Sequence, residues 1–323
     1  MQLKAALTAA VDRLDAAEIG SPRLNAETLL MFVLGVNRAY LYAHPELELN
    51  PEEQSRYDEV IAQRATGMPS QYITGHQEFW GLDFVVSPAV LIPRPETEHL
   101  VETVLEIIRE QHEQLATKLT VVDVGTGSGC VALALANELP FAKVYATDIS
   151  ADALKIAEAN AARLQLERRV EFSQCDVLQP VVRPSYRGPS TRADVLGQND
   201  TAELHDFDFV VSNPPYVAYS EADKVQKSVK EFEPEVAVFA GKHGLDVLIR
   251  LIDQAHAALK SGGWLAMEIG YSMREQVLAL LDAEVWQESR VIPDLQGISR
   301  VIAAQKLHPG RTKAGPSTAE AVS

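Results

Sequence analysis

Hydrophobic positions in the first 66 residues recur at the three- and four-residue spacing that places them on one face of a helix. A second segment of this kind covers about residues 25–34. Another begins at Asn50, where Pro51 and Glu53 complete a capping pattern. The sequence therefore predicts a small helical domain over residues 1–70. Its first helix has an apolar face formed by Leu3, Ala6, Leu7, Ala10, Val11 and Leu14.

The pattern changes between Tyr72 and Leu91 to short runs of aromatic and β-branched residues, which Gly75 and Gly81 interrupt. Such runs between turn-forming residues are typical of short strands joined by a turn. We therefore predict a β-hairpin linker over residues 71–95.

From about residue 96 onward, short apolar strands alternate with helices. This alternation predicts an α/β fold with a parallel, doubly wound sheet over residues 96–307. Because they are rich in polar and turn-forming residues, we expect 179–206 to be a flexible insertion and 308–323 a disordered tail. The predicted strands are Leu119–Val124, Lys143–Thr147, Val170–Ser173, Phe207–Ser212, Trp264–Ile269 and Ser299–Ala304. The predicted helices are Glu96–Ala116, Cys130–Glu138, Ala151–Leu164, Leu245–Lys260 and Met273–Leu281.

The charge balance narrows the classes of partner. Lys and Arg number 29 and Asp and Glu number 45, so the formal charge is 29 − 45 = −16. Proteins whose affinity comes mainly from nucleic-acid phosphates need a Lys/Arg surface, so we expect no direct nucleic-acid partner. The charge permits a basic protein as partner, but from the charge alone we favour solubility as its explanation.

Two cysteines, Cys130 and Cys175, form neither a CxxC motif nor a Cys/His cluster, so we expect buried thiols and no metal site. No apolar run approaches the roughly 18 residues of a membrane helix, and the N-terminus lacks a signal-peptide pattern. We therefore expect a cytoplasmic monomer without a membrane segment.

One strand runs directly into a glycine loop, Gly125-Thr126-Gly127-Ser128-Gly129, which precedes a predicted helix. Glycines let the backbone turn sharply and leave no side chain between loop and ligand. Open α/β sheets bind ligands at the carboxyl ends of their strands. A tight turn without a ligand is the alternative, and the G-x-G-x-G spacing differs from the dinucleotide-binding pattern.

An acid, Asp148, ends the next predicted strand, where a carboxylate can accept hydrogen bonds from ribose hydroxyls. A helix cap is the alternative for Asp148, although Ser150 is better placed for it. Loop and acid together favour a ribose-bearing cofactor. Asp123 can meet a cofactor amine or brace the loop. Asp176 and Val177 can contact an adenine edge, although a plain loop explains them nearly as well.

The tetrapeptide Asn213-Pro214-Pro215-Tyr216 follows the fourth predicted strand. Two prolines make the backbone rigid and remove two donors, while their carbonyls remain acceptors. The Asn213 side-chain oxygen and the Pro214 carbonyl can hold both hydrogens of a planar NH2 group. That geometry places the nitrogen for in-line attack on an electrophilic methyl group. A structural Pro-Pro turn is the alternative, which the nearby glycine loop disfavours.

These motifs resemble the PrmC/HemK family, the protein-(glutamine-N5) methyltransferases that modify class-1 peptide chain release factors. The resemblance spans about residues 20–305. Besides the glycine loop and Asn213–Tyr216, it is carried by the segments 21–27, 75–84, 90–98, 232–235 and 240–241. Pro93-Arg94-Pro95-Glu96-Thr97-Glu98 is the most selective motif, because Asn-Pro-Pro-Tyr also occurs in adenine-N6 DNA methyltransferases.

The resemblance implies a class I, Rossmann-like methyltransferase domain with a mostly parallel seven-stranded sheet. It also implies S-adenosylmethionine as the cofactor and the glutamine of a Gly-Gly-Gln motif as the substrate, with the helical domain contacting the release factor. The implied cofactor residues are Gly125, Thr126, Gly127, Ser128, Gly129, Asp148, Asp176, Val177 and Asn213. The implied substrate residues are Asn213, Pro214, Pro215 and Tyr216, of which Asn213 and Pro214 serve catalysis.

Two features depart from the family pattern. Relatives often carry a larger side chain at Val177, and their connection between Asp176 and Asn213 is usually shorter. The roles of Arg94, Glu96 and Thr97 stay open between a structural Arg94–Glu96 pair and a loop that closes the cofactor site. We expect a structural role for Glu268 at the end of the fifth strand.

Three other functions remain as alternatives. An adenine-N6 methyltransferase shares the chemistry, but the net charge of −16 counts against it. The glycine spacing and the tetrapeptide disfavour an NAD-dependent oxidoreductase. The cofactor loop disfavours a non-catalytic binding module.

Overall fold

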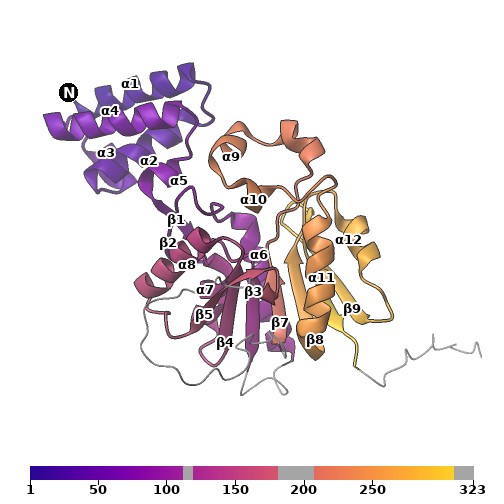
Figure 1. Ribbon diagram of the computed structural model, residues 1–323. Helices are drawn as coiled ribbons and strands as arrows, with labels where there is room; N and C mark the ends of the chain where they lie inside the picture. The colour runs from indigo at the N-terminus through magenta and orange to yellow at the C-terminus, as the bar shows by residue number, and fades with distance from the viewer. Residues whose placement is uncertain (112–118, 181–206, 309–323) are drawn as a thin grey trace, which may run out of the picture.

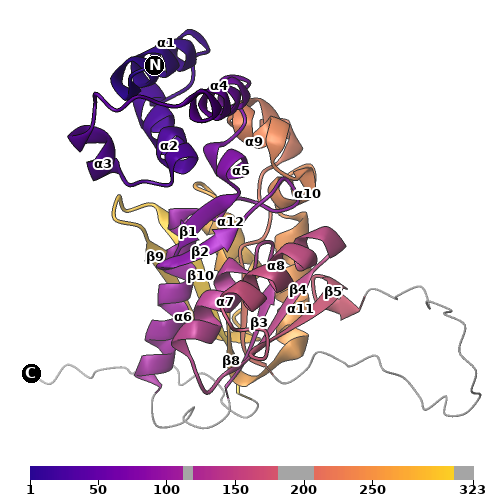
Figure 2. The ribbon, with the colours of Figure 1, turned by 90° about the vertical axis from the view of Figure 1, so that its left-hand side faces the viewer.

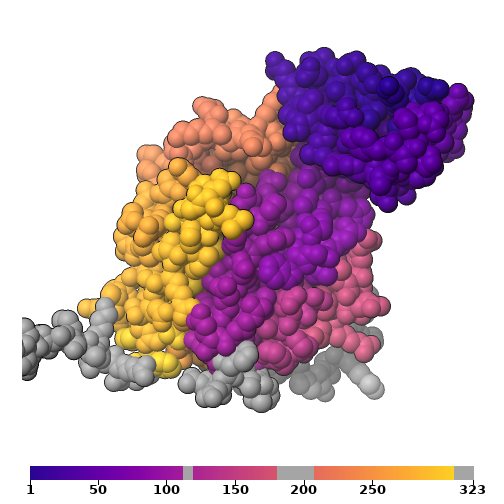
Figure 3. Space-filling view, turned by 180° about the vertical axis from the view of Figure 1, so that it is seen from behind, coloured from indigo at the N-terminus to yellow at the C-terminus, as the bar shows by residue number. Residues whose placement is uncertain are grey.

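The computed structural model describes residues 1–111, 119–180 and 207–308. Helices at the N-terminus form a lobe that stands above one end of a large sheet (Figures 1 and 2). The space-filling view from behind shows this lobe projecting beyond the rest of the molecule (Figure 3). Its helices are α1 (Leu3–Ala16), α2 (Pro22–Leu34), α3 (Arg38–Ala43), α4 (Pro51–Ala65) and α5 (Ser70–Thr74).

The N-terminal lobe has a small core of its own. Leu14, Leu29, Leu30 and Tyr57 are buried in it, and the Tyr57 hydroxyl donates a hydrogen bond to the Ala26 carbonyl. The capping pattern predicted at the start of α4 is present, with reciprocal bonds between the residues at its first turn. Helix α3 was not predicted, and α2 begins three residues earlier than expected, at a proline that suits a first helical turn.

A short antiparallel hairpin follows the lobe, as the change of pattern predicted. It consists of β1 (His76–Phe79) and β2 (Leu82–Val85). Phe79 and Phe84 are buried and pack edge to face, with 6.2 Å between ring centroids. The hairpin thus anchors in the core on one face of the large sheet.

The large sheet has the strand order β6-β5-β4-β3-β7-β8-β10-β9. Strands β5, β4, β3, β7 and β8 are parallel, whereas β10 is antiparallel to both its neighbours. The predicted seven-stranded, mostly parallel sheet is confirmed, with β6 as an additional two-residue strand. The strands are β3 (Thr120–Val124), β4 (Lys143–Asp148), β5 (Val170–Asp176), β6 (Gln179–Pro180), β7 (Phe207–Ser212), β8 (Leu259–Glu268), β9 (Trp286–Pro293) and β10 (Ser299–Lys306).

Helices cover both faces of this sheet (Figure 1). The core on one face joins α6, α7 and α8 to the strands, and the core on the other joins α11 and α12. Short helical turns lie between β7 and α11. The elements are η1 (Pro95–Thr97), α6 (Glu98–Glu110), α7 (Cys130–Glu138), α8 (Ala151–Arg163), η2 (Tyr219–Lys224), α9 (Lys227–Phe232), α10 (Glu235–Val238), α11 (Asp246–Ala258) and α12 (Arg274–Leu280).

Some predicted boundaries were wrong for local reasons. The helix predicted from residue 96 starts as a 3₁₀ turn, in which the Thr97 amide donates to the Arg94 carbonyl, and the α-helix begins at Glu98. Strand β8 begins at Leu259, five residues before the prediction, because it continues through two glycines. Gln179 and Pro180 belong to β6 and not to the predicted insertion. The rest of that segment, 181–206, and residues 309–323 of the predicted tail lie outside the described residues.

Candidate functional site

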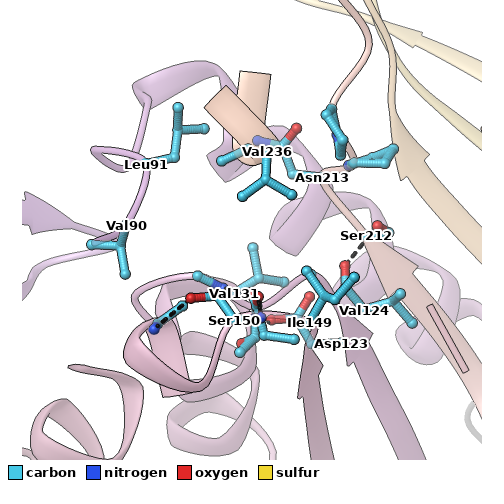
Figure 4. A pocket seen from close by; sticks show the side chains of 18 of the residues that line it. Val90, Leu91, Asp123, Val124, Val131, Ile149, Ser150, Ser212, Asn213 and Val236 are labelled. Atoms are coloured by element: carbon cyan, nitrogen blue, oxygen red, sulfur yellow. Dashed lines mark hydrogen bonds between the residues drawn. The ribbon is translucent and has the colours of Figure 1, made fainter. Parts of the chain in front are cut away.

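A cavity opens at the carboxyl ends of β3, β4 and β7 (Figure 4). Strand β3 lies between β4 and β7, so the chain connections leave it in opposite directions at this point. Such a switch point is where open α/β sheets bind ligands. The cavity encloses about 1140 Å³ of empty space, including the part open to solvent. All the predicted site residues except Gly129 and Tyr216 line it.

The glycine loop is shaped by three left-handed residues, Gly125, Gly127 and Gly129, with φ values of 72°, 56° and 84°. A Cβ added at Gly125 or Gly127 would meet no atom within 4 Å, so the backbone there faces open space. A Cβ at Gly129 would lie 3.1 Å from Leu133 Cδ1 and 3.2 Å from Ala157 Cβ. Gly129 therefore permits close packing of α7 on α8, and its assignment to the cofactor stays a prediction.

The Asp148 carboxylate joins the end of β4 to the glycine loop. Its Oδ2 accepts a hydrogen bond from the Gly127 amide at 2.9 Å, and its Oδ1 accepts one from the Ser150 amide at 2.8 Å. The Ser150 hydroxyl caps α8 by accepting from the Ala153 amide. Burial raises the pKa of Asp148, while the backbone hydrogen bonds oppose the rise. A carboxylate has further lone pairs, so Asp148 can still accept from a ligand.

Asp123 lies beneath the loop and is almost completely buried. Its Oδ2 accepts hydrogen bonds from the Thr126 hydroxyl at 2.7 Å and from the Ala132 amide at 3.2 Å. Burial raises the pKa of Asp123 to about 7. The two hydrogen bonds lower this pKa, whereas the nearby charge of Asp148 raises it further. Of the two roles considered from the sequence, these contacts favour bracing of the loop.

At the end of β5, Asp176 and the following Val177 line the same cavity. Both Asp176 carboxylate oxygens contact Arg250 Nη1, at 2.9 and 2.8 Å. Val177 is buried with a left-handed φ of 60°, and its carbonyl accepts a hydrogen bond from the Thr147 hydroxyl at 3.1 Å. Arg250, from α11, was not predicted, because nothing in its local sequence marks it.

The tetrapeptide lines the cavity through Asn213 and the two prolines, and Asn213 lies on the opposite side of the cavity from Val131 and Ser150 (Figure 4). Just before it, the Ser212 hydroxyl donates to the Val124 carbonyl at 2.7 Å, so β7 is tied to the strand that enters the glycine loop. The Asn213 amide nitrogen donates to the Thr97 hydroxyl at 3.0 Å. The loop and the tetrapeptide are thus brought to one site, as the sequence predicted.

Behind Asn213 lies a buried carboxylate, Glu268, at the end of β8. Its Oε2 accepts from the Thr97 hydroxyl at 2.6 Å, and its Oε1 accepts from the Tyr216 hydroxyl at 3.2 Å. Burial raises the pKa of Glu268 to about 6; the bonds from Thr97 and Tyr216 and the charge of Arg300 oppose the rise. Tyr216 therefore lies behind the cavity wall.

The segment before α6 forms part of the cavity wall through Arg94 and Thr97. Arg94 forms an ion pair with the buried Glu233, whose other oxygen accepts from the Ile92 amide at 3.3 Å. The Arg94–Glu96 pair considered from the sequence was wrong, because Glu233 occupies the guanidinium. Glu233, which follows the tetrapeptide in the sequence, therefore holds the Arg94 part of the cavity wall in place.

Within the described ranges, no three His, Cys, Asp or Glu side chains group closely enough to hold a metal ion. Both cysteines are buried free thiols, and burial raises the pKa of Cys130 to about 12 and that of Cys175 to about 11. Among the helices that the structure describes, none is long and apolar enough to cross a membrane.

Comparison with known proteins finds relatives for both the helical lobe and the sheet. A family model of the PrmC N-terminal domain matches residues 5–75, and one of a methyltransferase domain matches residues 115–314. Among solved structures, the catalytic domain of hMettl16 in complex with the MAT2A 3′UTR hairpin 6 aligns with a TM-score of 0.51 at 17% identity. The alignment covers 77% of this chain and 82% of that one, and it shows a shared fold alone.

Two bacterial relatives match almost from end to end. The release factor glutamine methyltransferase of Koribacter versatilis is 51% identical over 306 residues, which cover 95% of this chain and 99% of that protein. The protein of the same name from Moorella thermoacetica is 40% identical over 307 residues, with 95% and 99% covered. With identity this high across both the helical lobe and the sheet, the chain belongs to the release factor glutamine methyltransferase family.

Proposed function

We propose that the protein transfers a methyl group from S-adenosylmethionine to the side-chain amide nitrogen of the glutamine in the Gly-Gly-Gln motif of class-1 release factors. One observation carries the proposal: the amide of Asn213 faces the cavity that the glycine loop forms, with its nitrogen already held by Thr97. Its oxygen is thereby left to accept a hydrogen bond from an incoming NH2 group. The family membership supports the same substrate.

The cavity fits S-adenosylmethionine on its own geometry. The open space beside Gly125 and Gly127 can take the methionine part of the cofactor, with Thr126 and Ser128 completing the loop. Asp148 would accept from the ribose hydroxyls. Asp176 and Val177 would flank the adenine, with Arg250 holding the carboxylate of Asp176 in place. When bound, the cofactor supplies an electrophilic methyl group on a sulfonium.

The tetrapeptide would hold the other reactant. Asn213 Oδ1 and the Pro214 carbonyl accept hydrogen bonds from the two N–H groups of the glutamine amide, and Pro215 lines the pocket beside them. Tyr216 supports the pocket from behind, through its hydrogen bond to Glu268. Hydrogen bonding to both N–H bonds raises the electron density on a nitrogen that is otherwise weakly nucleophilic. As the N–C bond forms, the S–C bond breaks and its electron pair stays on sulfur. The nitrogen then loses a proton to solvent, so no strong general base is required.

We also propose a role for each part of the chain. Residues 1–70 contact the body of the release factor, residues 71–95 link them to the sheet, and residues 96–307 carry the chemistry. The protein works as a monomer in the cytoplasm without a nucleic-acid partner. The net charge of −16 supports a protein substrate over DNA or RNA.

Incubation with methyl-labelled S-adenosylmethionine tests the proposal. One sample contains a class-1 release factor, a second the same factor with the glutamine of its Gly-Gly-Gln motif changed to alanine, and a third duplex DNA. We expect label in the first sample only, and mass spectrometry should locate one added methyl group on that glutamine. Label in DNA with none in the release factor would instead establish the adenine-N6 alternative.

A further inference from the structure

We infer that Thr97 and Glu268 are positioning residues that set the orientation of the Asn213 amide. This inference rests on the proposed function, because it concerns the group that holds the substrate amide. The sequence leaves the role of Thr97 open and indicates a structural role for Glu268, and 171 positions separate the two residues along the chain. The fold brings them together behind Asn213.

The Thr97 hydroxyl has a single proton to donate. Thr97 Oγ1 lies 2.6 Å from Glu268 Oε2, and an ionised carboxylate can only accept, so the proton points to Glu268. Toward Asn213, 3.0 Å away, Thr97 can then only accept. The Asn213 atom that faces Thr97 must be the nitrogen. Its oxygen is consequently turned to the other side, toward the cavity.

The far end of this chain of hydrogen bonds is also fixed. The second oxygen of Glu268 accepts from the Tyr216 hydroxyl at 3.2 Å, so donors occupy both carboxylate oxygens. Thr97 is 1% exposed and Glu268 is 3% exposed, so water does not compete for these bonds. The charge of Arg300 favours the ionised carboxylate, whereas that of Glu96 disfavours it.

The orientation matters because an asparagine amide has two nearly isosteric orientations. A rotation of 180° about its last torsion exchanges the acceptor for a donor. The flipped group would point its own N–H bonds at the NH2 of the substrate, where two donors repel each other. A buried carboxylate costs folding free energy, so its presence here is best explained by the orientation that it imposes.

Four single variants test the inference in a methylation assay with a class-1 release factor. Thr97→Val removes the hydroxyl at nearly constant volume, and Thr97→Ser keeps it. Thr97→Ala removes it with a smaller side chain, in case the valine variant does not fold. The matched control is Thr103→Val, which removes a buried hydroxyl from α6 that donates to the His99 carbonyl and does not contact Asn213.

We expect Thr97→Val and Thr97→Ala to lower kcat by about 10-fold to 100-fold, as misplacement of a reacting group does. KM for S-adenosylmethionine should change by less than about threefold. Thr97→Ser should stay within about threefold of the wild-type kcat, as should Thr103→Val. In an Asn213→Ala background, Thr97→Val should cause no further loss, because the residue acts through the missing amide.

Separate results distinguish the two proposals. A wild-type protein that does not methylate the release factor would disprove the proposed function, and the inference with it. An active wild type together with unchanged kcat in both hydroxyl-deleting variants would overturn the inference alone. Losses that multiply in the double variant would also overturn it, because Thr97 would then act independently of Asn213.

Discussion

The Asp148 carboxylate and the Gly127 amide are joined by a hydrogen bond of 2.9 Å, which ties the end of β4 to the middle of the glycine loop. The same side chain faces the cavity, so it shapes the loop and remains available to a ligand. One carboxylate therefore shapes the loop and also lines the cavity.

Asp148→Ala should weaken the binding of S-adenosylmethionine by about 1–3 kcal/mol, because the ribose hydroxyls and the loop amide both lose an acceptor. Calorimetric titration of the protein with the cofactor measures the change. Asp152→Ala is the control, since Asp152 is exposed on α8 and forms an ion pair with Lys155. Equal affinities of wild type and Asp148→Ala would argue against Asp148 as a ribose acceptor.

Alanine substitutions at Gly127 and Gly129 should affect stability and cofactor binding differently. Gly129→Ala places a Cβ 3.1 Å from Leu133 and 3.2 Å from Ala157, at a left-handed φ, so it should lower the free energy of unfolding by about 1–3 kcal/mol. Gly127→Ala meets no atom within 4 Å, so its stability cost should be the strain of φ alone, about 1–2 kcal/mol. Its methyl group would instead enter the cofactor space.

Denaturant unfolding without cofactor, followed by cofactor titration, separates these effects. For a given loss in the free energy of unfolding, Gly127→Ala should lose more affinity for S-adenosylmethionine than Gly129→Ala does. The opposite ranking would assign the ligand contact to Gly129.

If the tetrapeptide holds the substrate amide as proposed, Asn213→Ala removes one of two acceptors, while the main-chain carbonyl of Pro214 remains. The interaction strengthens as the nitrogen becomes positive, so kcat should fall by about 10²–10³. Thermal stability and cofactor affinity should change much less. Asn213→Asp should retain some activity, because a carboxylate can still accept. Methylation by Asn213→Ala at the wild-type rate would remove Asn213 from the mechanism.

The rate should depend on pH through Glu268. Burial raises the pKa of this carboxyl to about 6, and only the ionised form compels the Thr97 proton to point toward it. The wild-type kcat should therefore fall as the pH falls through about 6. Glu268→Gln carries no titrating group, so the ratio of its kcat to that of the wild type should rise over the same interval. A constant ratio from pH 5 to pH 8 would contradict this role.

Stability should depend on pH through Asp123, in the direction set by its raised pKa of about 7. Between the pKa of an unfolded aspartate, about 4, and pH 7, the folded protein retains a proton that the unfolded chain has lost. The free energy of unfolding should therefore decrease as the pH rises through this range. Asp123→Asn stays neutral and should show a smaller decrease in denaturant titrations at several pH values. Glu158→Gln, at an exposed position, controls for the loss of a carboxylate.

The local sequence was sufficient to predict an element where its hydrophobic pattern ends at a clear turn signal. Phe207–Ser212 is a buried apolar run that ends at a Pro-Pro pair, so its bounds were predicted as observed. Strand β9 was missed because it lies at the edge of the sheet and carries exposed Glu288 and Ser289 among its residues. An edge strand with a solvated face lacks the apolar run that marks a central one.

Contacts between distant segments explain why part of the site was not predicted. The glycine loop and the tetrapeptide each carry their chemistry in consecutive residues. The partners of Thr97 and Arg94, in contrast, lie 171 and 139 positions away, at Glu268 and Glu233. No local pattern distinguishes such a carboxylate from a structural one until the fold brings the partners together.

The bond between Ser212 and Val124 has a consequence for how the family can vary. The adjacent parallel strands β3 and β7 lead into the glycine loop and the tetrapeptide, and their ladder fixes the separation of the two segments. This separation does not depend on the number of residues between Pro180 and Phe207. Insertions and deletions there should leave the distance between the glycine loop and the tetrapeptide unchanged. Differences in the length of this segment among homologues are therefore a poor guide to differences in activity.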